Sequence, residues 1–395
     1  MKGSSDVWRS VFLVAVVAVV FGGYIFFQNS PLQEVKALEN DEWTFAEYTE
    51  YFEDIAEERG APYAYRVLRE AVLTPGTDLH LLGHVVGDVL YDQQGIEGIH
   101  ECTPEFRNAC SHSVVIGLFN ERGVEALSDI SAACRNAPGG SGAYTMCFHG
   151  LGHGVLAYNL YDYEKAISMC KKTGTAEYNN REYIECVGGA TMEIIAGVHD
   201  RASWEIAHEK YFKDDEPLYP CTADFMPEEA RPICLTYLTP HLFESAGLDL
   251  GNPLPSGYDE AFAQCSELPE DAFLEREACY GGFGKEFIVL VKERDIRNVD
   301  VFSTEELQTI HSWCELADNQ AGIHACKGHA LASLFWGGEN DPQVSVDFCA
   351  VAGIEADSCF AQLATHIQYY FPQGLEKDSL CRLLPEPHSV RCARL

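Results

Sequence analysis

The sequence of 395 residues lacks most of the short motifs by which enzymes are recognised. It contains no H-E-x-x-H metalloprotease motif, no G-x-S-x-G nucleophile elbow and no Walker-type phosphate loop. None of its cysteines belongs to a C-x-x-C pair, which excludes a thioredoxin-like redox motif, a zinc ribbon and a c-type haem attachment site. The familiar hydrolase, phosphate-loop and thiol-redox classes are therefore not indicated.

Basic residues are also scarce. The chain has 27 Lys and Arg against 61 Asp and Glu, which gives a net charge of -34. Such a charge repels nucleic-acid phosphates and anionic lipid headgroups, so we expect neither as a partner. It attracts cations, including metal ions and basic peptides, and it also favours solubility.

Only one apolar run is long enough to cross a membrane. Val11 to Phe27 carries no charge over 17 residues, Lys2 and Arg9 precede it, and acidic residues dominate after it. This charge order predicts that the bulk of the chain lies outside the cytoplasm. We expect a cytoplasmic segment over 1–10, an uncleaved transmembrane signal anchor over 11–27, a linker over 28–40 and a cysteine-rich helical domain over 41–395. That domain would be periplasmic or extracellular, and the membrane would be a partner through this single helix.

Sixteen cysteines fall into eight consecutive pairs, with partners 8 to 16 positions apart. On an exported chain this pattern predicts eight disulfides. Pairing of neighbours, as in Cys134 with Cys147, closes short loops that each stabilise the fold by about 2–4 kcal/mol. The alternative joins the start of one helix to the end of the next, as in Cys147 with Cys170, and the spacing leaves both open. The cysteines are Cys102, Cys110, Cys134, Cys147, Cys170, Cys186, Cys221, Cys234, Cys265, Cys279, Cys314, Cys326, Cys349, Cys359, Cys381 and Cys392.

A short frame recurs around these cysteines. At Cys147 it reads C-F-H-G-L-G-H-G, and related segments begin at Cys110, Cys186, Cys279 and Cys326. An earlier copy over 78–88, D-L-H-L-L-G-H-V-V-G-D, has no cysteine and keeps both histidines. The glycines of the frame would let another backbone approach closely. Two helices per unit and a period of about 32 to 48 residues predict an all-α solenoid.

Each unit is predicted to contain one helix after the cysteine, as over 146–160 or 184–197, and a second helix that ends near the next cysteine. The segment 161–170 shows the second helix, with Asp162 as its N-cap. Its residues D-Y-E-K-A, 162–166, resemble the linker and second helix of Sel1/TPR-type repeats, and this resemblance implies the architecture alone. Loops over 136–142, 268–270 and 384–387 punctuate the array, and a helical segment over 41–75 would cap it. The expected fold is a disulfide-stapled α-solenoid of helical hairpins, remotely Sel1/TPR-like, behind a transmembrane anchor.

Five histidines occupy equivalent positions in the first three units. Counted from the cysteine position, the second place holds His80, His112 and His149, and the sixth holds His84 and His153. Stacking of three such helices would bring the five imidazoles into one layer, because positions four apart share a helix face. Imidazoles with one carboxylate suit iron, zinc, copper or nickel. The predicted transition-metal ligands are His80, His84, Asp88, His112, His149 and His153.

The histidines outside this register, and two glutamates, are interpreted mainly as structural residues. We interpret four histidines as hydrogen-bond partners of loop carbonyls, namely His199, His208, His311 and His388. Three are weaker metal candidates, namely His241, His329 and His366. Glu193 and Glu286 share the seventh place, where they could line the same surface as the histidines, and we favour the interpretation that they are solvated carboxylates.

Two functions follow from this pattern. The first is a metal-dependent enzyme, with oxidation or hydroxylation at iron or copper as plausible as hydrolysis at zinc. The second is a disulfide-stabilised scaffold whose concave face binds a protein or peptide, with structural histidines and no catalysis. Metal analysis separates the two hypotheses, because only the first requires the purified protein to retain a transition metal.

Overall fold

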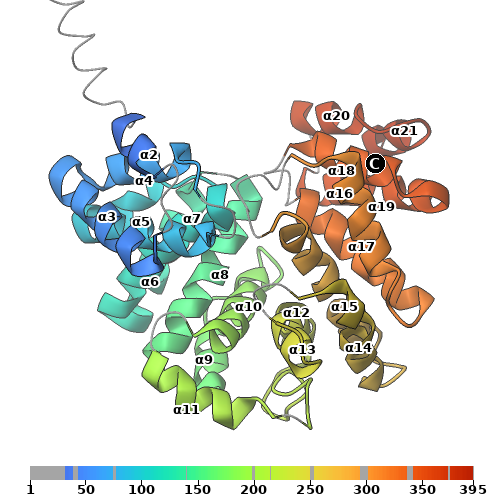
Figure 1. The fold of residues 1–395 in the computed structure, drawn as a ribbon, viewed down its shortest axis with the longest axis horizontal. Coiled ribbons are helices and arrows are strands. Elements are labelled where there is room, and N and C mark those ends of the chain that lie inside the picture. The colour runs from blue at the N-terminus through green and yellow to red at the C-terminus, as the bar shows by residue number, and fades with distance from the viewer. Residues whose placement is uncertain are drawn as a thin grey trace, which may run out of the picture. The chain divides into compact units, whose positions relative to one another are not determined.

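The computed structural model describes residues 32–38, 43–73, 77–138, 140–197, 201–213, 215–249, 253–293, 301–335, 341–371 and 374–394 (Figure 1). Over these ranges the chain forms helices and no strands, which confirms the all-α class. None of the helices in these ranges is both long and apolar enough to cross a membrane. The predicted anchor over 11–27 lies outside the described residues. The chain divides into two compact units, residues 1–74 and 75–395.

The first unit contains α2 (Leu32–Leu38), α3 (Phe45–Arg59) and α4 (Ala61–Glu70). Helix α3 begins with a capping box, because Thr44 accepts a hydrogen bond from the Glu47 backbone and the Glu47 side chain bonds back to Thr44. The predicted helical spacing is confirmed, since α3 buries one face. The buried residues are Tyr48, Phe52, Ile55 and Ala56. The role of this unit as a cap stays a prediction.

The second unit contains a row of helices in which each member packs on the next (Figure 1). The row is α5 (Leu79–Gln94), α6 (Ala109–Arg122), α8 (Gly140–Tyr158), α10 (Arg181–Ala196), α12 (Arg231–Tyr237), α15 (Phe273–Leu290), α17 (Gln320–Phe335) and α19 (Ala356–Tyr370). The row's helices are the ones that carry the recurring frame.

The other α-helices of this unit lie between members of the row in sequence or, for α20 and α21, follow its last member. They are α7 (Leu127–Asn136), α9 (Tyr163–Cys170), α11 (Arg201–Tyr211), α13 (Thr239–Ser245), α14 (Tyr258–Ala263), α16 (Thr304–Cys314), α18 (Pro342–Ala350), α20 (Leu375–Cys381) and α21 (His388–Arg394). The N-cap prediction at Asp162 is confirmed, because its side chain accepts from the Lys165 backbone at 3.2 Å. The predicted loop over 136–142 is too long, since α8 already begins at Gly140. Burial of Ala143 and Tyr144 in the first turns outweighs the poor helix propensity of glycine there.

Eight disulfides join consecutive cysteines, so all sixteen are paired. Their Cα–Cα distances run from 5.2 to 5.8 Å, within the range that disulfides span. Neighbour pairing is confirmed, and the alternative of Cys147 with Cys170 is wrong. Each bond ties the end of one helix or turn to the helix that follows it. The pairs are Cys102–Cys110, Cys134–Cys147, Cys170–Cys186, Cys221–Cys234, Cys265–Cys279, Cys314–Cys326, Cys349–Cys359 and Cys381–Cys392.

Glycines set the spacing between the first helices of the row. A Cβ atom on Gly152 of α8 would lie 2.0 Å from the Cys186 carbonyl oxygen of α10, and one on Gly150 would lie 2.6 Å from the Cα of His112 in α6. No real side chain tolerates such distances, so only glycine permits this approach. The predicted close backbone approach is therefore confirmed, and it places side chains of α5, α6 and α8 against one another.

Candidate metal centre

The five histidines of the register lie in one cluster formed by α5, α6 and α8. Neighbouring rings have centroid separations between 4.8 and 6.1 Å. The predicted gathering of imidazoles is therefore observed. Within this imidazole cluster, ring nitrogens of His80, His84 and His112 all lie within 4.8 Å of one another, which makes these three the group able to hold a metal ion.

Hydrogen bonds fix which nitrogen of His80 and His84 faces the cluster. Nδ1 of His80 lies 2.8 Å from the carbonyl oxygen of Phe106, which can only accept, so this nitrogen carries the proton. Nδ1 of His84 lies 3.0 Å from Ser113 Oγ, whose own hydroxyl proton is donated to the His84 carbonyl oxygen at 2.9 Å. Ser113 therefore accepts from His84. In the neutral state both rings present the lone pair of Nε2 to the cluster.

These two lone pairs face each other across 3.3 Å, the distance between the Nε2 atoms of His80 and His84. Two bare lone pairs at this distance repel, so the arrangement favours a cation between them. Two imidazoles on a tetrahedral metal, each with a bond of about 2.0–2.1 Å, have their nitrogens about 3.3 Å apart. The observed separation matches that value. A third ligand from His112 requires a small rotation of its ring, because 4.8 Å exceeds twice the metal–nitrogen bond.

His112 lies at the centre of the cluster and is almost fully buried. Among the described residues, neither of its ring nitrogens has a hydrogen-bond partner of normal geometry. Burial lowers its pKa well below the usual range, and the neighbouring His149 and His80 lower it further, while the Met146 carbonyl opposes the shift. An unsatisfied buried polar atom costs about 1–3 kcal/mol, which a metal ion bound at the ring would offset.

His153 is oriented by a buried carboxylate. Its Nδ1 lies 3.0 Å from Oε2 of Glu193, whose other oxygen accepts a hydrogen bond from the Tyr161 hydroxyl. A carboxylate behind an imidazole fixes the tautomer and strengthens the outer nitrogen as a ligand. The interpretation of Glu193 as a solvated carboxylate is wrong, because the residue is fully buried. Its seventh place, which Glu286 shares and which directly follows the sixth place, is the signal that could have identified it.

His149 connects the cluster to a second group of residues. Its ring packs on Tyr237, with centroids 4.7 Å apart, and its Nδ1 lies 4.0 Å from a carboxylate oxygen of Glu185. Burial lowers the pKa of His149 well below its usual value and raises the pKa of Glu185 to about 7. Burial also lowers the pKa of His80. Neutral imidazoles at neutral pH are the form that binds metals.

A cavity of about 130 Å³ opens beside the cluster. His80, His112 and His149 line this cavity, together with Arg107, Tyr237 and Lys285. A second cavity of about 220 Å³ shares Met146, Tyr237 and Lys285 with the first. The imidazole cluster is therefore accessible to a small molecule. Glu286 also lines the first cavity with a side chain only 13% exposed, so its interpretation as solvated is wrong too.

Asp88 is exposed on α5 and is not a member of the three-histidine group. The carboxylate that contacts a histidine of the register closely is Glu193. A metal-ligand role for Asp88 stays a prediction that the geometry does not support.

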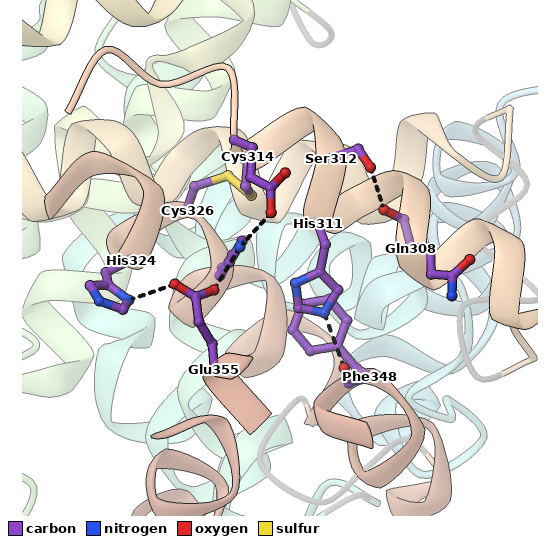
Figure 2. Close-up of polar contacts among 10 residues, drawn as sticks. Gln308, His311, Ser312, Cys314, His324, Cys326, Phe348 and Glu355 are labelled. Carbon is purple, nitrogen blue, oxygen red and sulfur yellow. Dashed lines mark hydrogen bonds and ion pairs between the residues drawn. A yellow bond between two sulfur atoms is a disulfide. The ribbon is translucent and has the colours of Figure 1, made fainter. Parts of the chain in front are cut away.

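The remaining histidines have separate surroundings. His311 is confirmed as a partner of a carbonyl, since its Nε2 lies 3.0 Å from the Phe348 oxygen (Figure 2). His388 instead contacts the Asp357 carboxylate at 2.9 Å, and His208 packs between the rings of Trp204 and Phe212, so the loop-carbonyl interpretation is not supported for these two. His241 packs on Phe212. His199 lies outside the described residues.

Comparison with known proteins returns no match. No protein-family model, no curated protein and no solved structure matches this chain. The site itself is therefore the basis for inferring a function.

Proposed function

We propose that this protein is an extracytoplasmic, metal-dependent enzyme, held at the membrane by residues 11–27, with a transition metal at the imidazole cluster. The observation that carries the proposal is the pair of Nε2 lone pairs of His80 and His84, 3.3 Å apart and oriented by Phe106 and Ser113. His112 would complete the ligand set, and His153, backed by Glu193, would be a fourth donor. In this arrangement the eight disulfide-linked helix pairs form a solenoid that presents the cluster to the cavity.

The donor set favours iron, copper, zinc or nickel. All sixteen cysteines form disulfides, which excludes thiolate ligands and leaves the imidazoles as the donors of the cluster. The bound metal would supply redox or Lewis-acid chemistry. The chain would hold it with neutral imidazoles, keep His153 in one tautomer through Glu193, and admit a small substrate through the adjoining cavity. If the protein retains iron or copper, the expected reaction is an oxidation, and if it retains zinc, the expected reaction is a hydrolysis.

Metal analysis of the purified full-length protein tests this proposal. After loading with Fe²⁺, Cu²⁺ or Zn²⁺ and extensive washing, we expect about one equivalent of one metal per chain. His84→Ala should lose it, whereas His311→Ala, outside the cluster, should retain it. Less than about one tenth of an equivalent in the wild type, for every metal tried, would reject the metal centre and leave the scaffold function.

A further inference from the structure

The second cavity, of about 220 Å³, is lined by two opposite charges that are not paired with each other. Both come from α10, where Arg181 and Glu185 lie one turn apart on the same face of the helix. The positive charge of Arg181 lowers the pKa of Glu185, so the two groups are near one another. In the part of the chain that the structure describes, however, no direct ion pair joins them.

The carboxylate of Glu185 has no hydrogen-bond donor among the described residues. Its ion-pair contact is Nδ1 of His149 at 4.0 Å, which is too long for a hydrogen bond, and its side chain is only 18% exposed. Burial raises the pKa of Glu185 to about 7, which is the effect of lost hydration that no neighbouring donor offsets. A cation bound beside this carboxylate would offset it.

The guanidinium of Arg181 contacts aromatic rings. Its central carbon lies 5.2 Å from the centre of the Tyr369 ring and 5.6 Å from that of Tyr370, and it also bonds to the Tyr370 hydroxyl. No carboxylate among the described residues forms an ion pair with it. A guanidinium has five N–H donors, so these contacts leave donors for a bound carboxylate.

The other ionisable groups that line this cavity add no net charge to it. The ammonium of Lys285 is paired with Glu286 at 2.8 Å. Burial lowers the pKa of His329 to about 4, so its ring is neutral at neutral pH. Burial also raises the pKa values of Tyr237 and Tyr370, so both phenols keep their protons. The charges available to a ligand are therefore one positive and one negative, both from α10.

From this arrangement we infer that the second cavity binds a free α-amino acid with an apolar side chain. Its ammonium would pair with Glu185 and its carboxylate with Arg181, because an α-amino acid carries both charges on one carbon and the two partners are neighbours on one helix face. The apolar side chain would contact Met146, Ile233 and Ala332, which line the same cavity. The inference goes beyond the proposed function and does not depend on a bound metal.

Calorimetric titration of the full-length protein with L-leucine tests this site. EDTA removes any metal, and a pH of about 8 keeps Glu185 ionised, since this lies above its pKa of about 7. We expect saturable binding of L-leucine. Two analogues each lack one charge, namely 4-methylpentanoate, without the amine, and 3-methylbutylamine, without the carboxylate. Each should bind at least about tenfold more weakly, because it loses one charged hydrogen-bonding group.

Two variants assign each charge of the ligand to its partner. Glu185→Gln should weaken L-leucine binding by at least about tenfold and leave the affinity for 4-methylpentanoate unchanged. Arg181→Gln should weaken L-leucine binding as much and leave the affinity for 3-methylbutylamine unchanged. Arg135→Gln is the matched control, because it removes an exposed arginine paired with Glu177 on the surface, and it should keep wild-type affinity for L-leucine. If circular dichroism shows that one cavity variant does not fold, the other variant and the two analogues decide the test.

Three results would each overturn the inference. They are no saturable binding of L-leucine up to about 10 mM, equal affinity for L-leucine and either analogue, and wild-type affinity for L-leucine in a folded Glu185→Gln or Arg181→Gln variant. The metal proposal is tested separately, because His84→Ala should lose the metal and keep L-leucine binding. A wild type that binds L-leucine but retains no metal would reject the proposed enzyme and leave this site.

Discussion

Histidines in the two halves of the helix row occupy very different surroundings. In α5, α6 and α8 the rings face one another, and two of them approach nitrogen to nitrogen at 3.3 Å. In α16 and α17 each ring has its own neighbour (Figure 2). His311 stacks on Phe348 at 4.1 Å and bonds to its carbonyl, while His324 lies 3.9 Å from Glu355 at the surface. The imidazoles are therefore gathered in one half of the row, whereas in the other half His311 and His324 each contact a different residue.

The difference comes from the residues at two places of the recurring frame. In α8 the second and sixth places after the cysteine hold His149 and His153, whereas in α17 they hold Gly328 and Ala332. In the later helices α15 and α17 pack closely at Gly284, where a Cβ atom would lie 1.9 Å from the Cys326 carbonyl oxygen, and the ring of His329 lies against Gly281. Close glycine contacts between neighbouring helices occur in both halves, and a cluster of imidazoles forms only where histidines fill these two places.

The largest expected effect tests whether the imidazoles act together. His84→Ala and His153→Ala, on different helices, should each lower metal affinity by more than about 100-fold, because loss of a ligand exceeds the 10–100-fold cost of losing an outer-shell partner. Competition titration with a chromogenic chelator measures it. The contrast between the halves would break down if His311→Ala lowered metal affinity as much, or if each cluster variant removed only a weak site of its own.

A smaller loss of metal affinity is expected from changing the carboxylate that orients His153. Glu193→Gln keeps the shape of the side chain and removes the charge that orients His153, so metal affinity should fall by about 10–100-fold. Glu355→Gln, which alters the carboxylate beside His324 in the other half, is the matched control and should leave affinity unchanged. Wild-type affinity in Glu193→Gln would mean that His153 is not a ligand.

Acid should destabilise the metal-free protein. Burial lowers the pKa of His329 from 6.5 to about 4, so between these values the unfolded chain binds the proton that the folded chain does not. The free energy of unfolding therefore falls as pH drops from about 6.5 towards 4, by up to about 1.4 kcal/mol per pH unit for one histidine. His112 and His149, whose pKa values are also lowered by burial, act in the same direction.

Urea denaturation in EDTA at pH 7, 5.5 and 4.5 measures this slope. His329→Gln should reduce the dependence of the free energy of unfolding on pH by the contribution of one histidine. His112→Gln, in the other half of the row, should reduce it in the same way. A stability that is constant or rises on acidification would contradict the burial of neutral imidazoles.

The smallest effect is expected at Asp88. Because this side chain is exposed, Asp88→Asn should change stability by less than about 0.5 kcal/mol and metal affinity by less than about twofold. The same chelator competition detects any larger change. A loss comparable to that of Glu193→Gln would restore Asp88 to the ligand set.

Much of this architecture could be predicted from the sequence because it depends on local signals. The cysteine count and spacing predicted eight disulfides, Asp162 marked the start of α9, and the shared register of five histidines indicated their gathering. Features that depend on distant contacts could not be predicted. The burial of Glu193 depends on Tyr161 and His153, and the left-handed turn over Phe106, Arg107 and Asn108 contains no glycine, with Asn108 as its one residue that favours this region. The choice between two disulfide schemes likewise depended on which helix ends meet in space.

The pairing of consecutive cysteines also determines how the chain can mature. Partners are separated by only 8 to 16 positions, and no bond encloses another. A polypeptide that enters an oxidising compartment N-terminus first would expose both members of one pair before the first member of the next. Each bond can therefore close in the order of translocation, without shuffling among sixteen thiols. We expect the protein to oxidise correctly with little help from a disulfide isomerase, in contrast to exported proteins whose bonds cross.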